Sequence, residues 1–541
     1  NCFFTEDAFE ALRRTVVHSP HYPYFIVPMA RISDNAALLT PGFSPPAGEE
    51  PQISFRCDAT ELFDEKIPYG RRPKVNLLWR LGVSGAWDRY RCEVWDPPHP
   101  GPSDQIGWFK TAGWVARLNS GRPDLEAGKK SMHSRGVARD VSISTYLDNL
   151  DGRRYLGVYD PEEPVFYPAQ ALKEATRNSP NVTKALYEAA QAALHRGPYS
   201  VADKLGTAPS GDKYDYFSQA PYWWPRPASL TGRPFVRRDG EFYPGTKLFS
   251  PGSEQFDRSS FQNLCDDATS LILAGTVFDQ ADFKQHAALL VRTWFVNPKT
   301  AMKPNLSYAQ VRLGHDDDLG TGRGLIDFRD IVRVLDCVRL LSADGFLSEQ
   351  ELGLFRAWLS EFANWLETDP KALTERVQSN NHGNYYDLQL AGIARYLGDD
   401  AMLARTANWA KLRLSVQVAE DGSMPSELSR TRPAHYVAFT LAAWNHLARV
   451  YDGTGEDVWS WTGSKGQSLT DAYQWLSDTA KAKSLIGPEE SGFDYDRLIP
   501  LWSDCRKHLP SVTDVPVFET DECRPVLDPD FSILPYWQLA R

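Results

Sequence analysis

The chain has 541 residues, a length typical of two to four domain-sized units or of one large repeat-built domain with an extension. Hydrophobic residues make up 42% and charged residues 24%, which excludes a disordered protein, and no apolar run is long enough to span a bilayer, so no membrane partner is expected. The formal net charge is −11 without any basic block, which excludes nucleic acid as the main partner and leaves the oligomeric state unknown.

The aromatic content of the chain is high, at 12%, with 17 Trp and 23 Tyr. Flat aromatic faces stack on the C–H faces of sugar rings, while the polar edges of Trp and Tyr take hydrogen bonds. The same residues also build large cores, so the composition permits a sugar-binding groove without requiring one.

Three features of the sequence indicate where in or outside the cell the protein acts: the start of the chain, its sequons and its cysteines. The sequence begins at Asn1 without an initiator Met, so either a signal peptide has been removed or the sequence has been trimmed. Two glycosylation sequons, at Asn181 and Asn305, support a secreted glycoprotein weakly. Seven cysteines lack CxxC spacing and permit up to three disulfides, with Cys337 expected as the buried free thiol. We therefore expect an extracellular protein.

Residues 1–165 differ in composition from the rest of the chain, being rich in Pro, Gly and Trp. An opening helix is predicted over Glu6–Val17. Runs of β-prone residues predict strands at Lys74–Arg80, Tyr90–Trp95 and Val141–Tyr146. This region is expected to be β-rich, and its function is not legible from the sequence.

From about Pro168 onward, apolar residues recur at helical spacing, which predicts a helical domain over residues 166–505. In one of its segments, Ser348 and Glu351 make a capping box ahead of an apolar face. Short linkers imply antiparallel helix pairs, so we expect a mainly α fold, an (α/α) toroid or incomplete α/α barrel, with residues 506–541 as a tail packed on it. The predicted helices are Ala169–Arg177, Val182–His195, Ser259–Val277, Ala281–Phe295, Leu325–Leu341, Ser348–Thr368, Tyr385–Leu397, Asp400–Val418, Pro433–Tyr451 and Leu469–Ser484.

Four irregular segments, dense in polar and aromatic residues, interrupt the helices. Loops between toroid helices gather at one rim, so their side chains can meet in one cleft. The third segment places Asn381 beside His382 at the start of a helix, and the fourth places Arg430 six residues before Tyr436. The segments are 214–239, 297–310, 378–387 and 421–436.

These four residue types suit β-elimination from a uronic acid. The proton on C5 is too weakly acidic for ordinary bases unless the neighbouring carboxylate is held by cationic or amide donors, a task that suits Asn381 and Arg430. A base must then take the proton and an acid must protonate the departing O4, and His382 and Tyr436 suit these tasks. Taken singly, each residue has an ordinary structural explanation, as a cap, a surface ion pair or a core residue.

The chain from about Pro168 to Trp502 resembles the alginate lyase superfamily domain of polysaccharide lyase families 5 and 38. Several long motifs in one order carry the resemblance, and the spacing between the Arg and the Tyr looks like that of family 38. The motifs are Gly197-Pro198-Tyr199-Ser200-Val201, Tyr214-Asp215-Tyr216, Ala220-Pro221-Tyr222-Trp223-Trp224-Pro225, Arg292-Thr293-Trp294-Phe295, Asn380-Asn381-His382-Gly383 and Glu427-Leu428-Ser429-Arg430-Thr431-Arg432 with His435-Tyr436.

The resemblance implies an α/α toroid and metal-independent elimination without a cofactor, on an anionic polysaccharide such as alginate (polymannuronate in particular) or glucuronan. It assigns carboxylate neutralisation to Asn381 and Arg430, and the acid role to Tyr436, which also serves as base in a syn elimination. His382 would be the base for the opposite C5 configuration or would orient the carboxylate. Further substrate-binding candidates are Tyr222, Trp223, Trp224, Arg238, Tyr308, Gln310, Asn380, Arg432 and His435.

Two other interpretations remain open at this point. An α/α-barrel glycoside hydrolase would need two carboxylates in the cleft, and Asp387 and Glu427 lie beside the motifs. A binding protein with an inactive site is the second, although all four groups required for elimination are present. A polyuronate enzyme with this net charge must also concentrate positive charge in its groove, because the field of the whole protein repels the polymer.

Overall fold

The structure is a computed structural model of the chain. It describes residues 159–540 except 228, 247–248, 253–254, 464, 482–492 and 524–533, and, before them, the backbone of four strands. The predicted helix Glu6–Val17 and the predicted strand Val141–Tyr146 lie outside the described residues.

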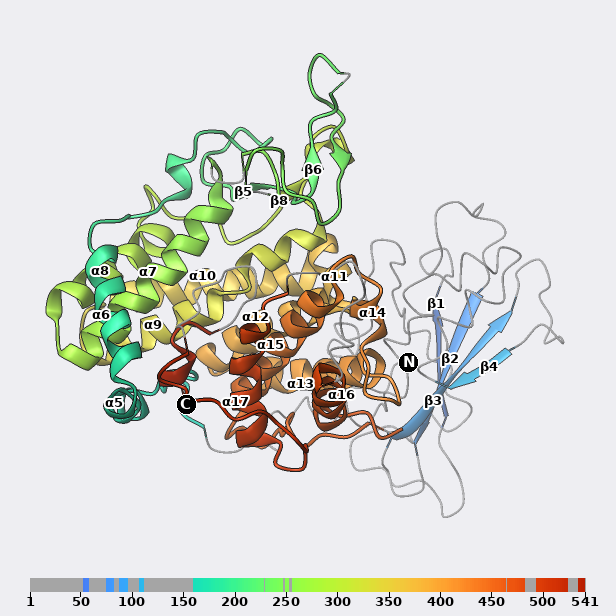
Figure 1. The fold of residues 1–541 in the computed structure, drawn as a ribbon. Helices are drawn as coiled ribbons and strands as arrows, with labels where there is room; N and C mark the ends of the chain where they lie inside the picture. The colour runs from blue at the N-terminus through green and yellow to red at the C-terminus, as the bar shows by residue number, and fades with distance from the viewer. Residues whose placement is uncertain are drawn as a thin grey trace.

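The four N-terminal strands form one antiparallel sheet in the order β1-β2-β3-β4 (Figure 1). The strands are β1 (Gln52–Cys57), β2 (Lys74–Leu81), β3 (Trp87–Trp95) and β4 (Gly107–Lys110). The predicted strands Lys74–Arg80 and Tyr90–Trp95 fall within β2 and β3, and a register shift interrupts their pairing at Arg80/Leu81. The limits of the N-terminal region stay a prediction.

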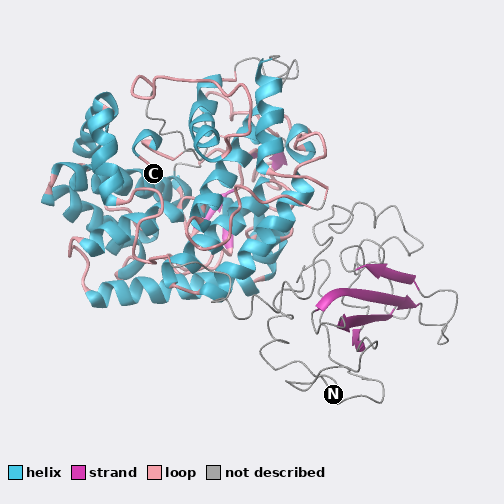
Figure 2. Cartoon of the chain, turned by 90° about the horizontal axis from the view of Figure 1, so that it is seen from below, coloured by secondary structure: helices cyan, strands magenta, loops and turns pink. Residues whose placement is uncertain are grey.

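The described residues from 159 onward form an α/α toroid of helices that pack in antiparallel pairs, as Figures 1 and 2 show. Neighbours in sequence pack on each other, as α7 does on α8 and α12 on α13, and α12 also packs on α15. The helices are α5 (Ala169–Asn178), α6 (Pro180–Ala193), α7 (Asp257–Phe278), α8 (Ala281–Val291), α9 (Ile331–Ala343), α10 (Glu349–Thr368), α11 (Pro370–Arg376), α12 (Asn381–Leu397), α13 (Asp400–Gln417), α14 (Pro425–Leu428), α15 (Pro433–Tyr451), α16 (Leu469–Lys481) and α17 (Ile499–His508).

Local signals fix the ends of several helices where the sequence places them. The Ser348 side chain accepts the backbone N–H of Glu351, whose carboxylate accepts the N–H of Ser348, so the capping box before α10 is confirmed. Gly398 ends α12 in the left-handed conformation, at φ 70°, and Asp399 caps α13. Each such cap contributes about 1 kcal/mol to helix stability.

Predictions fail where helices are short or change type. The predicted helix Leu325–Leu341 is divided into a 3₁₀ segment, Gly322–Phe328, and α9. The predicted Ala281–Phe295 ends as an α-helix at Val291 and continues as one π-helical turn. Three helices, α11, α14 and α17, were not predicted at all, because four to ten residues carry too little periodicity.

A single large core runs through the toroid and includes side chains near both ends of the described segment. The Tyr167 hydroxyl donates to the Pro535 carbonyl oxygen, and the hydroxyls of Ser270 and Tyr536 lie 2.9 Å apart. The chain after α17 therefore packs on the first helices of the toroid.

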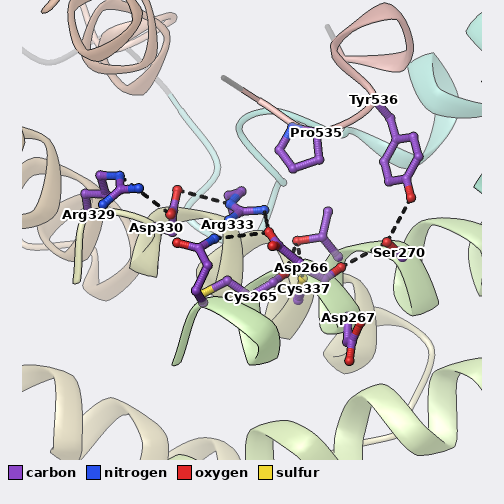
Figure 3. A network of polar contacts seen from close by, with 12 residues as sticks. Cys265, Asp266, Asp267, Ser270, Arg329, Asp330, Arg333, Cys337, Pro535 and Tyr536 are labelled. Atoms are coloured by element: carbon purple, nitrogen blue, oxygen red, sulfur yellow. Dashed lines mark hydrogen bonds and ion pairs between the residues drawn. The ribbon is translucent and has the colours of Figure 1, made fainter. Parts of the chain in front are cut away.

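A buried ionic network lies beside that packing (Figure 3). Arg333 bonds both Asp330, 3.2 Å away, and Asp266, 2.8 Å away, and Asp330 also lies 3.8 Å from Arg329. Burial alone would raise the pKa of Asp330, but the guanidinium groups of Arg333 and Arg329 lower it below its usual value. Every charge in this network therefore has a partner, which buried charges require.

The cysteines differ from the prediction. Cys337 is a buried free thiol, as expected, but Cys265, Cys505 and Cys523 are free as well. Three disulfides are therefore excluded by the described part of the chain.

Two short strand pairs build one wall above the helices (Figure 1). Strand β5 (Phe217–Gln219) pairs in parallel with β8 (Tyr308–Val311), and β6 (Trp223–Trp224) pairs antiparallel with β7 (Val236–Arg237). Gly320 packs against β8 so closely that an added Cβ would lie 2.6 Å from the Ala309 backbone. A glycine is therefore needed for the loop after β8 to return along this strand.

Candidate active site

A cleft of about 710 Å³ opens between this wall and the N-terminal ends of two toroid helices. All four residues proposed for elimination, Asn381, His382, Arg430 and Tyr436, line it. Asn381 and His382 are the first residues of α12, whereas Arg430 follows α14 and Tyr436 lies in the first turn of α15. Segments almost fifty residues apart in sequence therefore meet in one site.

The Asn381 side chain is fixed by a buried carboxylate. Its Nδ2 donates to Glu427 Oε2 at 3.0 Å, and its backbone N–H donates to Glu427 Oε1 at 2.8 Å. Burial raises the pKa of Glu427, although its hydrogen bonds from Asn381 act in the opposite direction. Asn381 Oδ1 has no hydrogen-bond partner among the described residues. Glu427 therefore orients the amide that borders the cleft.

His382 is held by a second carboxylate, which the sequence did not reveal. Its Nδ1 lies 2.7 Å from Glu375 Oε2, although the angle is not that of a regular hydrogen bond. Asn380 caps α12, since its side chain accepts the His382 backbone N–H at 3.1 Å. A carboxylate at Nδ1 favours the tautomer with its hydrogen there, which leaves Nε2 as the proton acceptor. Glu375 was missed because it belongs to the unpredicted helix α11.

Arg430 and Tyr436 form a contact pair. Arg430 Nη2 donates to the Tyr436 hydroxyl oxygen at 2.7 Å, and the guanidinium carbon lies 3.7 Å from the centre of the tyrosine ring. Tyr436 is almost buried, with 8% of its surface exposed. A guanidinium at the phenol oxygen stabilises negative charge there, and because it donates, the phenolic hydrogen is left for another acceptor.

The second histidine of the cleft is kept uncharged. Burial, together with the nearby charges of Arg432, Arg497 and Arg430, lowers the pKa of His435 to about 3. Its ring stacks on Phe439 with 5.7 Å between the ring centres. His435 is therefore neutral at ordinary pH and offers hydrogen bonds rather than charge.

Six of the nine further binding candidates line the cleft, and three do not. Trp224 turns away, since its Nε1 donates to the Phe249 carbonyl oxygen and its ring packs edge-on against Tyr243. Arg238 is exposed outside the cleft, and Tyr308 packs on the small core beneath β5 and β8. The cleft-lining candidates are Tyr222, Trp223, Gln310, Asn380, Arg432 and His435.

The cleft is strongly basic although the chain is acidic. Eight basic side chains line it against three acidic ones, so positive charge is concentrated where an anionic polymer would enter. Most of these cations were missed because they are spread over the sequence and form no local block. The basic residues are Arg237, Arg258, Arg312, Arg323, Arg329, Lys371, Arg430 and Arg432, and the acidic ones are Asp239, Asp316 and Glu375.

The geometry contradicts the hydrolase alternative. Asp387 is fully buried and bonds Arg413 through two oxygens, at 2.8 and 3.0 Å. Glu427 is also fully buried, and neither carboxylate belongs to the cleft lining. A hydrolase needs two carboxylates that flank the scissile bond, and this pair cannot reach a substrate.

Comparison with known proteins identifies relatives of this chain. The family model for alginate lyase matches residues 200–485. An alginate lyase structure from Bacteroides ovatus aligns at 27% identity and a TM-score of 0.60, covering 68% of this chain and 97% of that chain. Alginate lyase A1-III from Sphingomonas species A1 aligns at 14% identity and a TM-score of 0.44, covering 71% and 97%. No curated protein matches the chain.

The family match spans more than half of the sequence, and the resemblance inferred from the motifs is confirmed at the level of the family. The assignment to family 38 rather than family 5 stays a prediction. Among the described helices, none has both the length and the apolar character that a membrane crossing requires. The chain belongs to the alginate lyase family and is a polysaccharide lyase.

Proposed function

We propose that this lyase cleaves a uronic-acid polymer, alginate (polymannuronate in particular) or glucuronan, by metal-independent β-elimination in the basic cleft. The observation that carries the proposal is the meeting of Asn381, His382, Arg430 and Tyr436 around one cavity.

The proposed reaction begins with neutralisation of the substrate carboxylate. Arg430 and the amide of Asn381 donate to it, which stabilises the enolate-like intermediate that forms when C5 loses its proton. Glu427 holds the amide and Tyr436 holds the guanidinium, so both donors are oriented before substrate enters. This preorganisation lowers the barrier because the donors need not rearrange during the reaction.

Proton transfer then completes the elimination. A base takes the C5 proton, the electron pair forms the C4–C5 double bond, the bond from C4 to O4 breaks, and an acid gives O4 a proton. In a syn elimination, Tyr436 acts first as a phenolate that Arg430 stabilises: it takes the C5 proton and then gives that proton to O4 on the same face of the sugar. For the opposite C5 configuration, His382 Nε2 takes the proton and Tyr436 protonates O4.

A single spectroscopic assay tests the reaction class. Incubation with polymannuronate, polyguluronate and glucuronan should generate the ultraviolet absorbance of a conjugated, unsaturated uronate with at least one of these polymers. New reducing ends without that absorbance would mean hydrolysis and would overturn the proposal. The relative rates on the three polymers would show which uronate is preferred.

We also propose that the protein acts outside the cell. The proposed substrate is a polymer too large to cross a membrane unaided. The two glycosylation sequons are also typical of secreted proteins. Asn181 is exposed at the start of α6, as a glycan acceptor must be, whereas Asn305 is only partly exposed. Detection of the active protein in the culture medium of its native source would test this proposal.

A further inference from the structure

One group of cleft residues has no role in the reaction described above. Trp223 and Arg237 lie directly opposite each other on β6 and β7, so both side chains are on the same face of this hairpin. Both line the cleft. The hairpin therefore presents an aromatic face and a guanidinium beside each other, away from the helix ends that carry Asn381 and Tyr436.

A second arginine joins them from the chain after β8. The guanidinium carbon of Arg312 lies 5.3 Å from the centre of the Trp223 ring, and His315 packs edge-on against the same ring with 4.9 Å between centres. Arg312 is also ion-paired with Asp316, and Arg237 lies 3.0 Å from Asp239. Both guanidinium groups are thus held in place by acidic neighbours.

Arg323, in the 3₁₀ segment after this loop, is the third arginine and differs from the other two. Its side chain is exposed within the cleft and makes no hydrogen bond or ion pair with any residue that the structure describes. Burial by the cleft walls lowers the pKa of Arg323. The nearby carboxylate of Glu375 acts in the opposite direction, and the like charges of Arg237, Arg312 and Arg430 lower the pKa. An anion bound here would relieve that repulsion, and guanidinium groups suit carboxylates because they donate through a planar fork.

We propose that Arg237, Arg312 and Arg323, with Trp223, form a second uronate subsite, which binds the carboxylate of a sugar next to the one that is cleaved. The three guanidinium groups hold the carboxylate, and the indole face packs on the C–H face of the sugar ring. We call these four residues the arginine subsite. The inference rests on the proposed function, because it takes the ligand to be the same uronic-acid polymer.

The arginine subsite predicts a dependence on chain length. A substrate that reaches it gains binding energy at a distance from the reacting bond, and a substrate too short to reach it does not. Arg323→Gln should therefore raise the KM for the polymer about tenfold or more, as loss of a charge-assisted hydrogen bond does, and leave kcat near the wild-type value. The KM for the shortest oligouronate that the enzyme cleaves should change little.

Arg238→Gln is the matched control, since it removes the same charge from the adjacent position, outside the cleft. It should leave both KM values near wild type. An equal effect of Arg238→Gln would show that only the overall charge matters, and a fall in kcat at constant KM would place Arg323 at the reacting sugar. Equal KM changes for long and short substrates would also overturn the proposal.

A binding measurement separates this proposal from the reaction itself. Titration of saturated oligomannuronate into Tyr436→Phe protein, with and without Arg323→Gln, measures affinity without turnover. Weaker binding of the double variant to long oligomers, but not to short ones, would support the subsite even if the wild type gave no unsaturated product. Identical affinities of the two proteins would overturn the subsite while leaving the lyase reaction untouched.

Discussion

Arg430 donates a hydrogen bond to the hydroxyl oxygen of Tyr436 at 2.7 Å, while its guanidinium lies against the ring of the same residue. The two side chains thus act as a unit. A cation fixed at the phenol oxygen helps Tyr436 in both proposed roles. It stabilises the negative charge on the oxygen when Tyr436 acts as a base, and it positions the hydroxyl toward O4 when Tyr436 acts as an acid. This relationship leads to the first prediction.

Tyr436→Phe should lower kcat by about 10²–10⁴-fold, because it removes the transferable proton together with the hydroxyl oxygen that accepts from Arg430. Substrate affinity should stay close to wild type, since Arg430 keeps its charge. Initial rates from product absorbance, together with a binding titration, measure both quantities. Tyr214→Phe, outside the cleft lining, is the control and should retain full activity. Full activity of Tyr436→Phe would remove this residue from the mechanism.

Glu375→Gln should impair the histidine-dependent route selectively. The change keeps the size of the side chain but removes the charge that lies 2.7 Å from His382 Nδ1. Rates on the polymer whose C5 proton is taken by His382 should fall at least about tenfold, with a smaller effect on the polymer handled by Tyr436 alone. Assays on polymannuronate and polyguluronate compare the two. Glu361→Gln, exposed on α10, is the control, and equal losses on both polymers would contradict the positioning role of Glu375.

Asp387→Asn should destabilise the fold without abolishing catalysis. The variant leaves Arg413 buried without its counter-charge, which costs about 3–5 kcal/mol. Denaturant unfolding should show this loss, and the activity per folded molecule should match wild type at low temperature. A folded but inactive protein would instead restore a catalytic role for this carboxylate.

The stability of the fold should depend on pH through Asp257. Burial raises the pKa of this carboxyl to about 7, although Lys204 lies 3.0 Å away and the Phe217 backbone N–H donates to it. Because the folded state holds the proton more tightly, the contribution of Asp257 is complete below about pH 4 and is lost as pH rises to about 7, at roughly 1.4 kcal/mol per pH unit.

Asp257→Asn should remove that slope. Its free energy of unfolding should vary less than that of wild type between about pH 4 and pH 7 in parallel denaturant titrations. Identical slopes would mean that Asp257 is charged throughout and paired with Lys204. Asp203→Asn, at an exposed position nearby, offers a comparison in which the wild-type slope should be kept.

The sequence predicted the long helices because their signals are local. Ser348, Glu351 and the apolar face behind them act within a few turns, so α10 could be delimited closely. The face of a strand on which a side chain lies could not be predicted in this way. Trp223 and Arg237 face the cleft whereas Trp224 and Arg238 do not, and a shift of one residue decides this. Without the register of β6 and β7, a run such as Tyr-Trp-Trp or Arg-Arg does not reveal which of its side chains face the cleft.

Motifs in the sequence pointed to the four residues proposed for catalysis, but not to the carboxylates that hold two of them. Glu427 was assigned to the hydrolase alternative, yet it holds Asn381, and Glu375 lies in a helix too short to show periodicity. The cations Arg237, Arg312 and Arg323 come from three segments that only the folded chain brings together. A cluster of charges that comes from separate segments cannot be recognised from the sequence alone.

The bond from Tyr167 to Pro535 joins positions 368 residues apart, next to the ionic network of α7 and α9. The first helices of the toroid therefore cannot complete their packing until the C-terminal segment has folded against them. Such distant pairing slows assembly, because the entropy of closing a long loop must be lost before the contact forms. Proteolytic removal of the segment from Leu534 to Leu539 would then inactivate the enzyme, although this segment does not line the cleft.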